Sequence, residues 1–191
     1  MKELRRTTKE TDIIASLSLY GSGKGEIDTG VGFFDHMLSA FCKHALIDLS
    51  IKCVGDTYVD AHHSVEDCGI VIGQLLKDEI YPASNIERFS NSIVVMDEAA
   101  VECVMDVSNR SFLVYECDVD RDKVGDFDTE LSEEFFRAVV FNAGLSVHII
   151  KQRGKNAHHI IEAAFKAFAV ALRRAVAKNE RTGDASTKGV L

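Results

Sequence analysis

The apolar and polar positions of the chain follow an order of elements that occurs twice. Residues 11–20 end in alternating polar and apolar positions, which predicts a half-buried strand. Residues 33–41 place their apolar side chains on one helical face, and residues 45–54 are rich in strand-forming types. A mostly apolar helix that opens near His62 is then expected to end before Pro82, the single proline of the chain.

The second half shows the same order. It predicts strands over residues 93–96, 101–107 and 112–115, then a helix over 131–142, a strand over 145–150 and a long amphipathic helix over 157–177. Asn109 and Arg110 are interpreted as a turn between two of these strands. The repetition indicates an internal duplication. Its expected parts are residues 1–90, residues 91–178 and a tail over 179–191.

Three glycines lie within residues 21–25, Gly-Ser-Gly-Lys-Gly, and predict a loop. A hairpin from this loop into a strand at residues 26–29 is the expected continuation. The run lacks the Gly-Lys-Ser/Thr ending of a phosphate-binding loop, so it is not assigned to nucleotide binding.

A His-His-x-x-Glu motif occurs in both halves, as His62, His63 and Glu66 and again as His158, His159 and Glu162. If each motif opens a helix, the first histidine and the glutamate share a face, while the second histidine points about 100° aside. One motif then serves two metal ions. One such motif is a weak signal, but its recurrence at equivalent places favours metal binding.

Pseudo-symmetry extends the two predicted metal sites. His36 precedes its following strand by the same spacing as Glu134, so the two are interpreted as counterparts. The predicted ligand sets are His158, Glu162, His63 and His36 for one ion, and His62, Glu66, His159 and Glu134 for the other. Because neither contains a thiolate, manganese, iron or zinc fits better than copper(I) or an iron–sulfur cluster. His44 and His148 are given no role.

Composition and charge restrict the partners. The chain has 191 residues, 46% of them hydrophobic, with 22 basic against 30 acidic side chains and a formal charge of −8. That charge argues against a nucleic-acid or anionic-membrane partner. The five cysteines form no metal or disulfide pattern and are interpreted as reduced, apolar filler. Because no apolar leader or membrane span is recognised, a cytoplasmic location is expected.

Residues 183–189 offer hydroxyls and a cation, Ser186, Thr187 and Lys188, that suit a phosphate. Arg88 and Arg110, near turns between strands, would add guanidinium groups to the same phosphate.

Seven collinear motifs carry a resemblance to a known family: RTTKET at residues 6–11, TGVGFFDHML at 29–38, HHSVED at 62–67, MDE at 96–98, FFRA at 135–138, NAHHIIE at 156–162 and STKG at 186–189. With them the chain resembles the imidazoleglycerol-phosphate dehydratases of histidine biosynthesis over essentially its whole length. Two places depart from the usual pattern: Glu134, where many members carry histidine, and residues 108–111, Ser-Asn-Arg-Ser, where the usual pattern is Ser-Gly-Arg-Pro.

The resemblance implies an α+β fold with an internal duplication, each half a sheet with helices packed on one face. It implies dehydration of D-erythro-imidazole-glycerol phosphate to imidazole-acetol phosphate, with two manganese(II) ions per active site. It further implies a cage of 24 identical subunits with active sites between neighbours. Glu10 would be the acid/base residue, while Arg88, Arg110, Ser186 and Lys188 would grip the phosphate and the tail would close on it.

Two other functions fit the paired motifs taken alone. The first is a metal-storage or structural protein, in which the motifs cross-link helices without turnover. The second is a dimetal phosphohydrolase, which would release inorganic phosphate. Glu10 and the tail argue against storage, because storage needs neither.

Overall fold

The computed structural model describes residues 2–184 and 186. Its elements in chain order are β1 (Lys2–Thr7), β2 (Thr11–Ser18), β3 (Gly25–Asp28), α1 (Gly32–Ala45), β4 (Asp48–Gly55), α2 (His62–Ile80), β5 (Phe89–Met96), β6 (Ala99–Asp106), β7 (Phe112–Glu116), β8 (Lys123–Val124), β9 (Phe127–Asp128), α3 (Leu131–Ala143), β10 (Ser146–Arg153) and α4 (Ala157–Ala175). The predicted helices are confirmed, with ends that differ by at most four residues.

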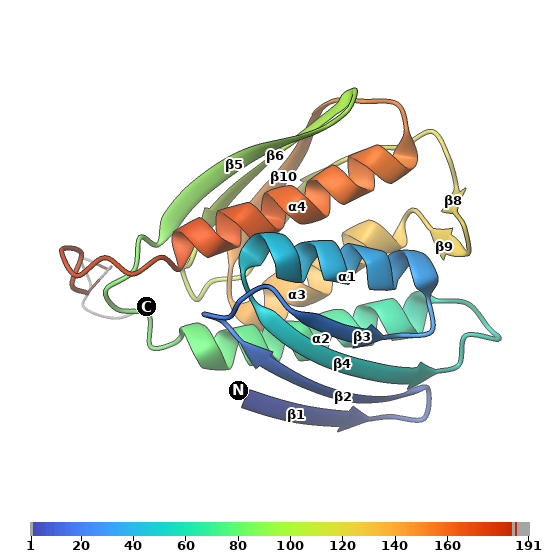
Figure 1. Ribbon diagram of the computed structural model, residues 1–191, viewed down its shortest axis with the longest axis horizontal. Coiled ribbons are helices and arrows are strands. Elements are labelled where there is room, and N and C mark those ends of the chain that lie inside the picture. The colour runs from blue at the N-terminus through green and yellow to red at the C-terminus, as the bar shows by residue number, and fades with distance from the viewer. Residues whose placement is uncertain (1, 185, 187–191) are drawn as a thin grey trace.

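Two four-stranded sheets have the same topology, β1-β2-β4-β3 in the first and β5-β6-β10-β7 in the second. In each sheet three strands pair antiparallel, and the fourth pairs parallel with the strand beside it. The two sheets form the outer layers, with the four helices between them (Figure 1). The predicted α+β duplication, with helices on one face of each sheet, is confirmed.

The halves join through their helices. Helices α1 and α2 contact the strands of the first sheet, and α3 and α4 contact those of the second, while α1 packs on α4 and α2 on α3. Gly73 permits the close approach of α2 to α3, since a β-carbon there would lie 2.7 Å from the carbonyl oxygen of Val139. Packing of α1 on α4 brings the first turns of these two helices together, with the rings of Phe33 and His158 5.0 Å apart.

The predicted hairpin from residues 11–20 into residues 26–29 is wrong. Both edges of β2 are already paired, with β1 and with β4, so β3 crosses to the far edge of the sheet and runs parallel to β4. Asp48 holds the crossover, because its Oδ1 accepts hydrogen bonds from the backbone N–H groups of Ser22 at 2.8 Å and Lys24 at 2.9 Å. The segment with Asn109 and Arg110 likewise leads to β7, which pairs with β10 and not with β6.

The core contains the side chains that the apolar pattern indicated. Phe34, Met37, Leu38 and Phe41 of α1 are buried. All five cysteines, each in the described part of the chain, are buried and free, as predicted. No helix among residues 2–184 is long and apolar enough to span a membrane.

Candidate metal centre

Three predicted ligands from α1 and α4 meet in this chain. The carboxylate Oε2 of Glu162 lies 3.2 Å from Nε2 of His158 and 3.6 Å from Nε2 of His36. Ligand atoms of all three residues lie within 4.8 Å of one another. Two nitrogens and one oxygen in this geometry suit a divalent metal ion.

Capping fixes where each motif helix begins. Asn156 caps α4, and its side-chain oxygen accepts from the backbone N–H of His158 at 3.0 Å and of His159 at 3.4 Å. At α2, Asp60 accepts from the N–H of His62 at 2.8 Å. Each motif therefore lies in a first helical turn, where residues four apart share a face.

The first motif, on α2, also shows the predicted pairing, since Nε2 of His62 lies 3.4 Å from Oε2 of Glu66. The two glutamates nevertheless differ in environment. The Glu66 side chain is 44% exposed, whereas that of Glu162 is 7% exposed.

Lys166 is a neighbour of the centre that the sequence interpretation missed. Its Nζ lies 2.7 Å from Oε1 of Glu162, which leaves Oε2 directed to the two histidines. Burial opposes ionisation of Glu162, but the hydrogen bond and charge of Lys166, with His36 and His158, outweigh burial and lower the pKa of that carboxyl. The i, i+4 spacing of Glu162 and Lys166 was the available signal. The equivalent position after Glu66 is Ile70, so the first motif lacks this partner.

The second histidine of each motif turns away from the first. The ring planes are 83° apart in both His62–His63 and His158–His159. Nδ1 of His63 lies 3.0 Å from Asp56, and Nδ1 of His159 lies 2.7 Å from Glu98.

These carboxylates hold both imidazoles as second-sphere residues hold metal-ligating histidines. Hydrogen bonding to Asp56 raises the pKa of His63, and hydrogen bonding to Glu98 raises the pKa of His159. The same bond from His159, with backbone N–H groups, lowers the pKa of Glu98 to about 2. Neither Asp56 nor Glu98 was assigned a role from sequence, although Glu98 lies in one of the family motifs.

The structure does not assemble either predicted four-ligand set within one chain. Among the described residues, His36, His158 and Glu162 are the only three His, Cys, Asp or Glu side chains grouped closely enough to hold a metal. Glu134 lies near Arg137 instead, with 3.7 Å between its Oε2 and the arginine Nε. His63 and His159 are held by carboxylates of their own halves. Within the described part of one chain, three of the four ligands predicted for the first ion are thus brought together.

Glu10 lies in the turn between β1 and β2. Its Oε1 is 3.7 Å from Nε2 of His63, and its side chain is 53% exposed. Thr8 fixes the turn by accepting the Glu10 N–H at 3.1 Å. The carboxylate is thus beside a predicted ligand and open to a substrate.

Two of the predicted phosphate-binding residues, Arg88 and Ser186, line the same groove, which has a volume of about 360 Å³ and is also lined by Thr182. Arg88 forms a fork with Asp106, at 2.8 Å from Nε and 3.3 Å from the second nitrogen, while Arg110 approaches Asp106 at 3.9 Å. Thr187 and Lys188 lie outside the described residues.

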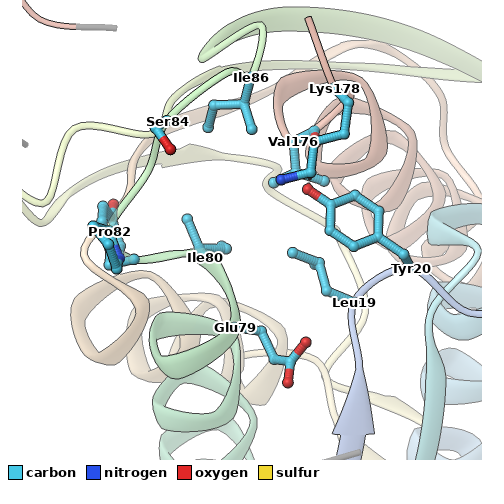
Figure 2. Close-up of a pocket in the computed structure, with 10 residues that line it drawn as sticks. Leu19, Tyr20, Glu79, Ile80, Pro82, Ser84, Ile86, Val176 and Lys178 are labelled. Atoms are coloured by element: carbon cyan, nitrogen blue, oxygen red, sulfur yellow. Dashed lines mark hydrogen bonds between the residues drawn. The ribbon is translucent and has the colours of Figure 1, made fainter. Parts of the chain in front are cut away.

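A separate cavity of about 170 Å³ lies at the opposite end of α2 (Figure 2). Glu79 and Ile80 line it, about 27 Å along the helix from His62. The Tyr20 hydroxyl donates to the carbonyl of Val176 at 2.9 Å, and the Lys178 ammonium lies 5.0 Å from the Tyr20 ring. The cavity thus lies about 27 Å along α2 from His62, at the other end of the helix from the first motif.

Glu98→Gln is expected to lower the pKa of His159 in metal-free protein, because the largest cause of the raised pKa is the hydrogen bond to Glu98. The raised pKa of His159 contributes stability below about pH 6.5, which is lost as pH rises through the raised value. The lowered pKa of Glu98 contributes stability above about pH 4.5, which is lost as pH falls towards about 2. The destabilisation by Glu98→Gln should therefore be largest between about pH 5 and pH 6.

NMR titration of His159 and urea unfolding at several pH values check this expectation. Glu79→Gln, at the far end of α2, is the control. An unchanged His159 pKa in Glu98→Gln would contradict it.

Known proteins share both the sequence and this architecture. A model of the family described as imidazoleglycerol-phosphate dehydratase matches residues 29–172. The imidazoleglycerol-phosphate dehydratase of Campylobacter curvus is 69% identical over 97% of this chain and 95% of its own length. That of Wolinella succinogenes is 65% identical over the full length of both chains.

Solved structures agree. The imidazoleglycerol-phosphate dehydratase of Staphylococcus aureus superposes with a TM-score of 0.83 at 43% identity, covering 93% of this chain and 98% of that chain. The Pyrococcus furiosus structure gives a TM-score of 0.84 at 39% identity, covering 98% of this chain and all of the other. With its duplicated fold and paired histidine motifs, this chain belongs to the imidazoleglycerol-phosphate dehydratase family.

Proposed function

We propose that this dehydratase of histidine biosynthesis converts D-erythro-imidazole-glycerol phosphate to imidazole-acetol phosphate at a centre that binds two manganese(II) ions. The observation that carries the proposal is the convergence of His36, His158 and Glu162. We further propose a cytoplasmic enzyme that assembles as 24 identical subunits.

The donor atoms fit a metal ion. Two atoms each about 2.1 Å from a divalent ion lie about 3.0 to 3.4 Å apart for bond angles of about 90 to 109°. The separations of Glu162 Oε2 from His158 and from His36 are 3.2 and 3.6 Å, close to that range. His62 and Glu66, 3.4 Å apart, would begin the second site.

Neighbouring subunits would supply the missing ligands. His63 and His159 each have Nδ1 occupied by a carboxylate, which leaves Nε2 as the atom for a metal. In the proposed assembly, His63 of one subunit completes the set of His36, His158 and Glu162 of another. His159 would likewise join His62 and Glu66, and Glu134 is proposed as the fourth ligand of that set.

Each protein group has a distinct task in the proposed reaction. Bound metal would supply positive charge that favours the imidazolate form of the substrate ring. Glu10 would move protons to and from the substrate side chain, as its exposed carboxylate beside His63 permits. Arg88, Arg110 and Ser186 would hold the phosphate, together with Thr187 and Lys188 of the tail.

Arg88→Lys is expected to raise KM about 10- to 100-fold with a smaller change in kcat, because lysine cannot reproduce the guanidinium fork. Arg5→Lys is a matched control, since Arg5 forms the same kind of fork with Asp12, at 3.2 and 2.8 Å. Steady-state kinetics of both variants provide the measurement. An equal change in KM for the two substitutions would show that Arg88 does not bind the phosphate.

One assay tests the reaction itself. Protein loaded with manganese is incubated with imidazole-glycerol phosphate, and the keto product and free phosphate are both measured. Dehydration predicts a ketone that keeps its phosphate ester. Release of inorganic phosphate would favour a phosphohydrolase, and metal binding without either product would favour storage.

A further inference from the structure

A polar cluster lies between α2 and the turn that carries Glu10, and we call its three residues, Arg6, Thr11 and Asp67, the Asp67 cluster. Oδ2 of Asp67 accepts a hydrogen bond from the Thr11 hydroxyl and forms an ion pair with Nη1 of Arg6, each at 2.5 Å. The Asp67 side chain is 9% exposed, and Thr11 is 3% exposed. Because Arg6 lies on β1 and Thr11 on β2, one buried carboxylate of α2 joins three elements.

Hydrogen bonds lead from this cluster to the backbone of Glu10. Because the Thr11 hydroxyl gives its single proton to Asp67, the Thr8 hydroxyl must be the donor in the 3.3 Å bond between the two threonines. The Thr8 oxygen accepts the backbone N–H groups of Glu10 at 3.1 Å and of Thr11 at 3.0 Å. The turn between β1 and β2 is therefore tied to α2 through Asp67.

Asp56 links the same turn to His63. The carbonyl of Glu10 accepts from the backbone N–H of Asp56 at 3.1 Å, and the Asp56 carboxylate lies 3.0 Å from Nδ1 of His63. Asp67 follows His63 by four residues, so both lie on the same face of α2. These contacts fix the backbone of Glu10 relative to the His63 ring.

The second half of the chain provides an internal comparison. Strands β4 and β10 each begin two residues after the left-handed residue that ends the preceding helix. Ser18 and Asp106, which pair with the first residues of these strands, are therefore counterparts. Thr11 precedes Ser18 by seven residues, and Ala99 precedes Asp106 by seven residues, so Thr11 and Ala99 are equivalent.

The second half has apolar residues at all three positions of the Asp67 cluster. Strand pairing makes Val94 the counterpart of Arg6, and Asp67 and Ala163 each follow the glutamate of their motif. Ala99 and Ala163 are fully buried, and Val94 packs against the core. The duplicated fold therefore does not need a buried ion pair at this place, and a buried ion pair is by itself weak evidence of stabilisation.

The glutamates of the two equivalent turns also differ in what holds them. Glu98 lies 2.7 Å from Nδ1 of His159 and accepts a backbone N–H group at 2.9 Å. Glu10 is 53% exposed and 3.7 Å from Nε2 of His63, whose Nδ1 atom is taken by Asp56. The side-chain contacts of Glu98 fix it directly, whereas the Glu10 carboxylate is open to a substrate and its place depends on the turn below it.

We propose that Asp67 is a positioning residue for Glu10. Through the Asp67 cluster it fixes the β1–β2 turn on α2 and thereby holds the Glu10 side chain beside His63. The inference rests on the proposed function, because it takes Glu10 as the acid/base residue. Since a misplacement of about 1 Å can lower a reaction rate about 100-fold, loss of the Asp67 carboxylate slows turnover without weakening substrate or metal binding.

Asp67→Asn tests this role in steady-state kinetics with manganese. We expect kcat to fall about 10- to 100-fold, while KM and the manganese stoichiometry measured by calorimetry stay at wild-type values. Asp12→Asn is the matched control, since Asp12 accepts from Thr7 at 2.7 Å and pairs with Arg5 at 2.8 Å in an exposed cluster on the same two strands. It should keep the wild-type kcat, because exposed ion pairs contribute little.

A double-mutant cycle separates positioning from a general structural role. In the Glu10→Gln background, Asp67→Asn should lower kcat by no more than about 3-fold further, because no acid/base group remains to be positioned. An equal loss in both backgrounds would overturn the proposal. Wild-type kcat in folded Asp67→Asn, or in Glu10→Gln itself, would overturn it as well.

Two further comparisons apply if Asp67→Asn does not fold. The triple variant Arg6→Val, Thr11→Ala and Asp67→Ala has the residues of the second half and leaves no buried charge unpaired, so it should fold and lose kcat to the same extent. Thr11→Ser, which keeps the hydroxyl, should retain more kcat than Thr11→Val. Circular dichroism checks that each variant is folded. Wild-type kcat in the folded triple variant, or equal kcat in the two Thr11 variants, contradicts the positioning role.

The keto-product assay on the wild-type protein is separate from these comparisons. Absent product contradicts the proposed function, whereas product formation with unchanged kcat in the variants contradicts only the role of Asp67.

Discussion

Glu162→Gln is expected to abolish metal binding at the centre of His36, His158 and Glu162, and to lower kcat/KM more than about 100-fold. The expected loss exceeds that of an outer-shell partner, whose removal costs about 10- to 100-fold in metal affinity or activity. Glu162 supplies the anionic oxygen nearest both histidines, at 3.2 and 3.6 Å. The amide would also leave the Lys166 ammonium without its carboxylate partner.

Manganese titration by calorimetry measures the affinity and the number of sites, and turnover is measured on the same samples. Glu79→Gln, on α2 near the remote cavity, is the control for a neutralised helical glutamate. Undiminished manganese stoichiometry in folded Glu162→Gln would show that this cluster holds no metal.

Glu10→Gln is expected to lower kcat about 10²- to 10⁴-fold, the range that a positioned acid/base group contributes, while metal binding persists. The amide keeps the shape of the side chain but cannot accept or return a proton. Since Glu10 lies 3.7 Å from His63 Nε2 and is half exposed, its substitution should leave the fold intact.

Kinetics and metal titration together separate the roles of Glu10 and Glu162. Loss of turnover with retained manganese assigns proton transfer to Glu10, whereas loss of both assigns it to metal binding. Wild-type kcat with manganese bound would exclude it from the chemistry.

The motif residues were predictable because their spacing is local. In a helix the residues at i and i+4 share a face whatever the rest of the chain does, so His158 and Glu162 had to meet once Asn156 started α4. The repeated order of elements likewise needed only hydrophobic periodicity. His36 was assigned to the ligand set by comparing the two halves, because an internal duplication identifies equivalent positions without knowledge of the fold.

Partners that lie outside the motif helices were not predictable in the same way. The carboxylates that orient His63 and His159 come from Asp56 and Glu98, seven and sixty-one residues away. The sequence also did not predict that β3 and β7 cross to a distant edge of their sheets, because a turn-like sequence does not say which sheet edge is still unpaired. Glu134 matched His36 by spacing, yet its side chain lies near Arg137.

The sequence by itself determined the duplicated α+β order, the family and the local half of each metal site, since all three depend on residues within one or two helical turns or on collinear motifs. Only the tertiary structure decided how α1 meets α4, which carboxylates hold the outward histidines, and which buried groups lie beneath the Glu10 turn. Those features depend on strand pairing and helix packing between distant segments. Local spacing carries no information about such contacts.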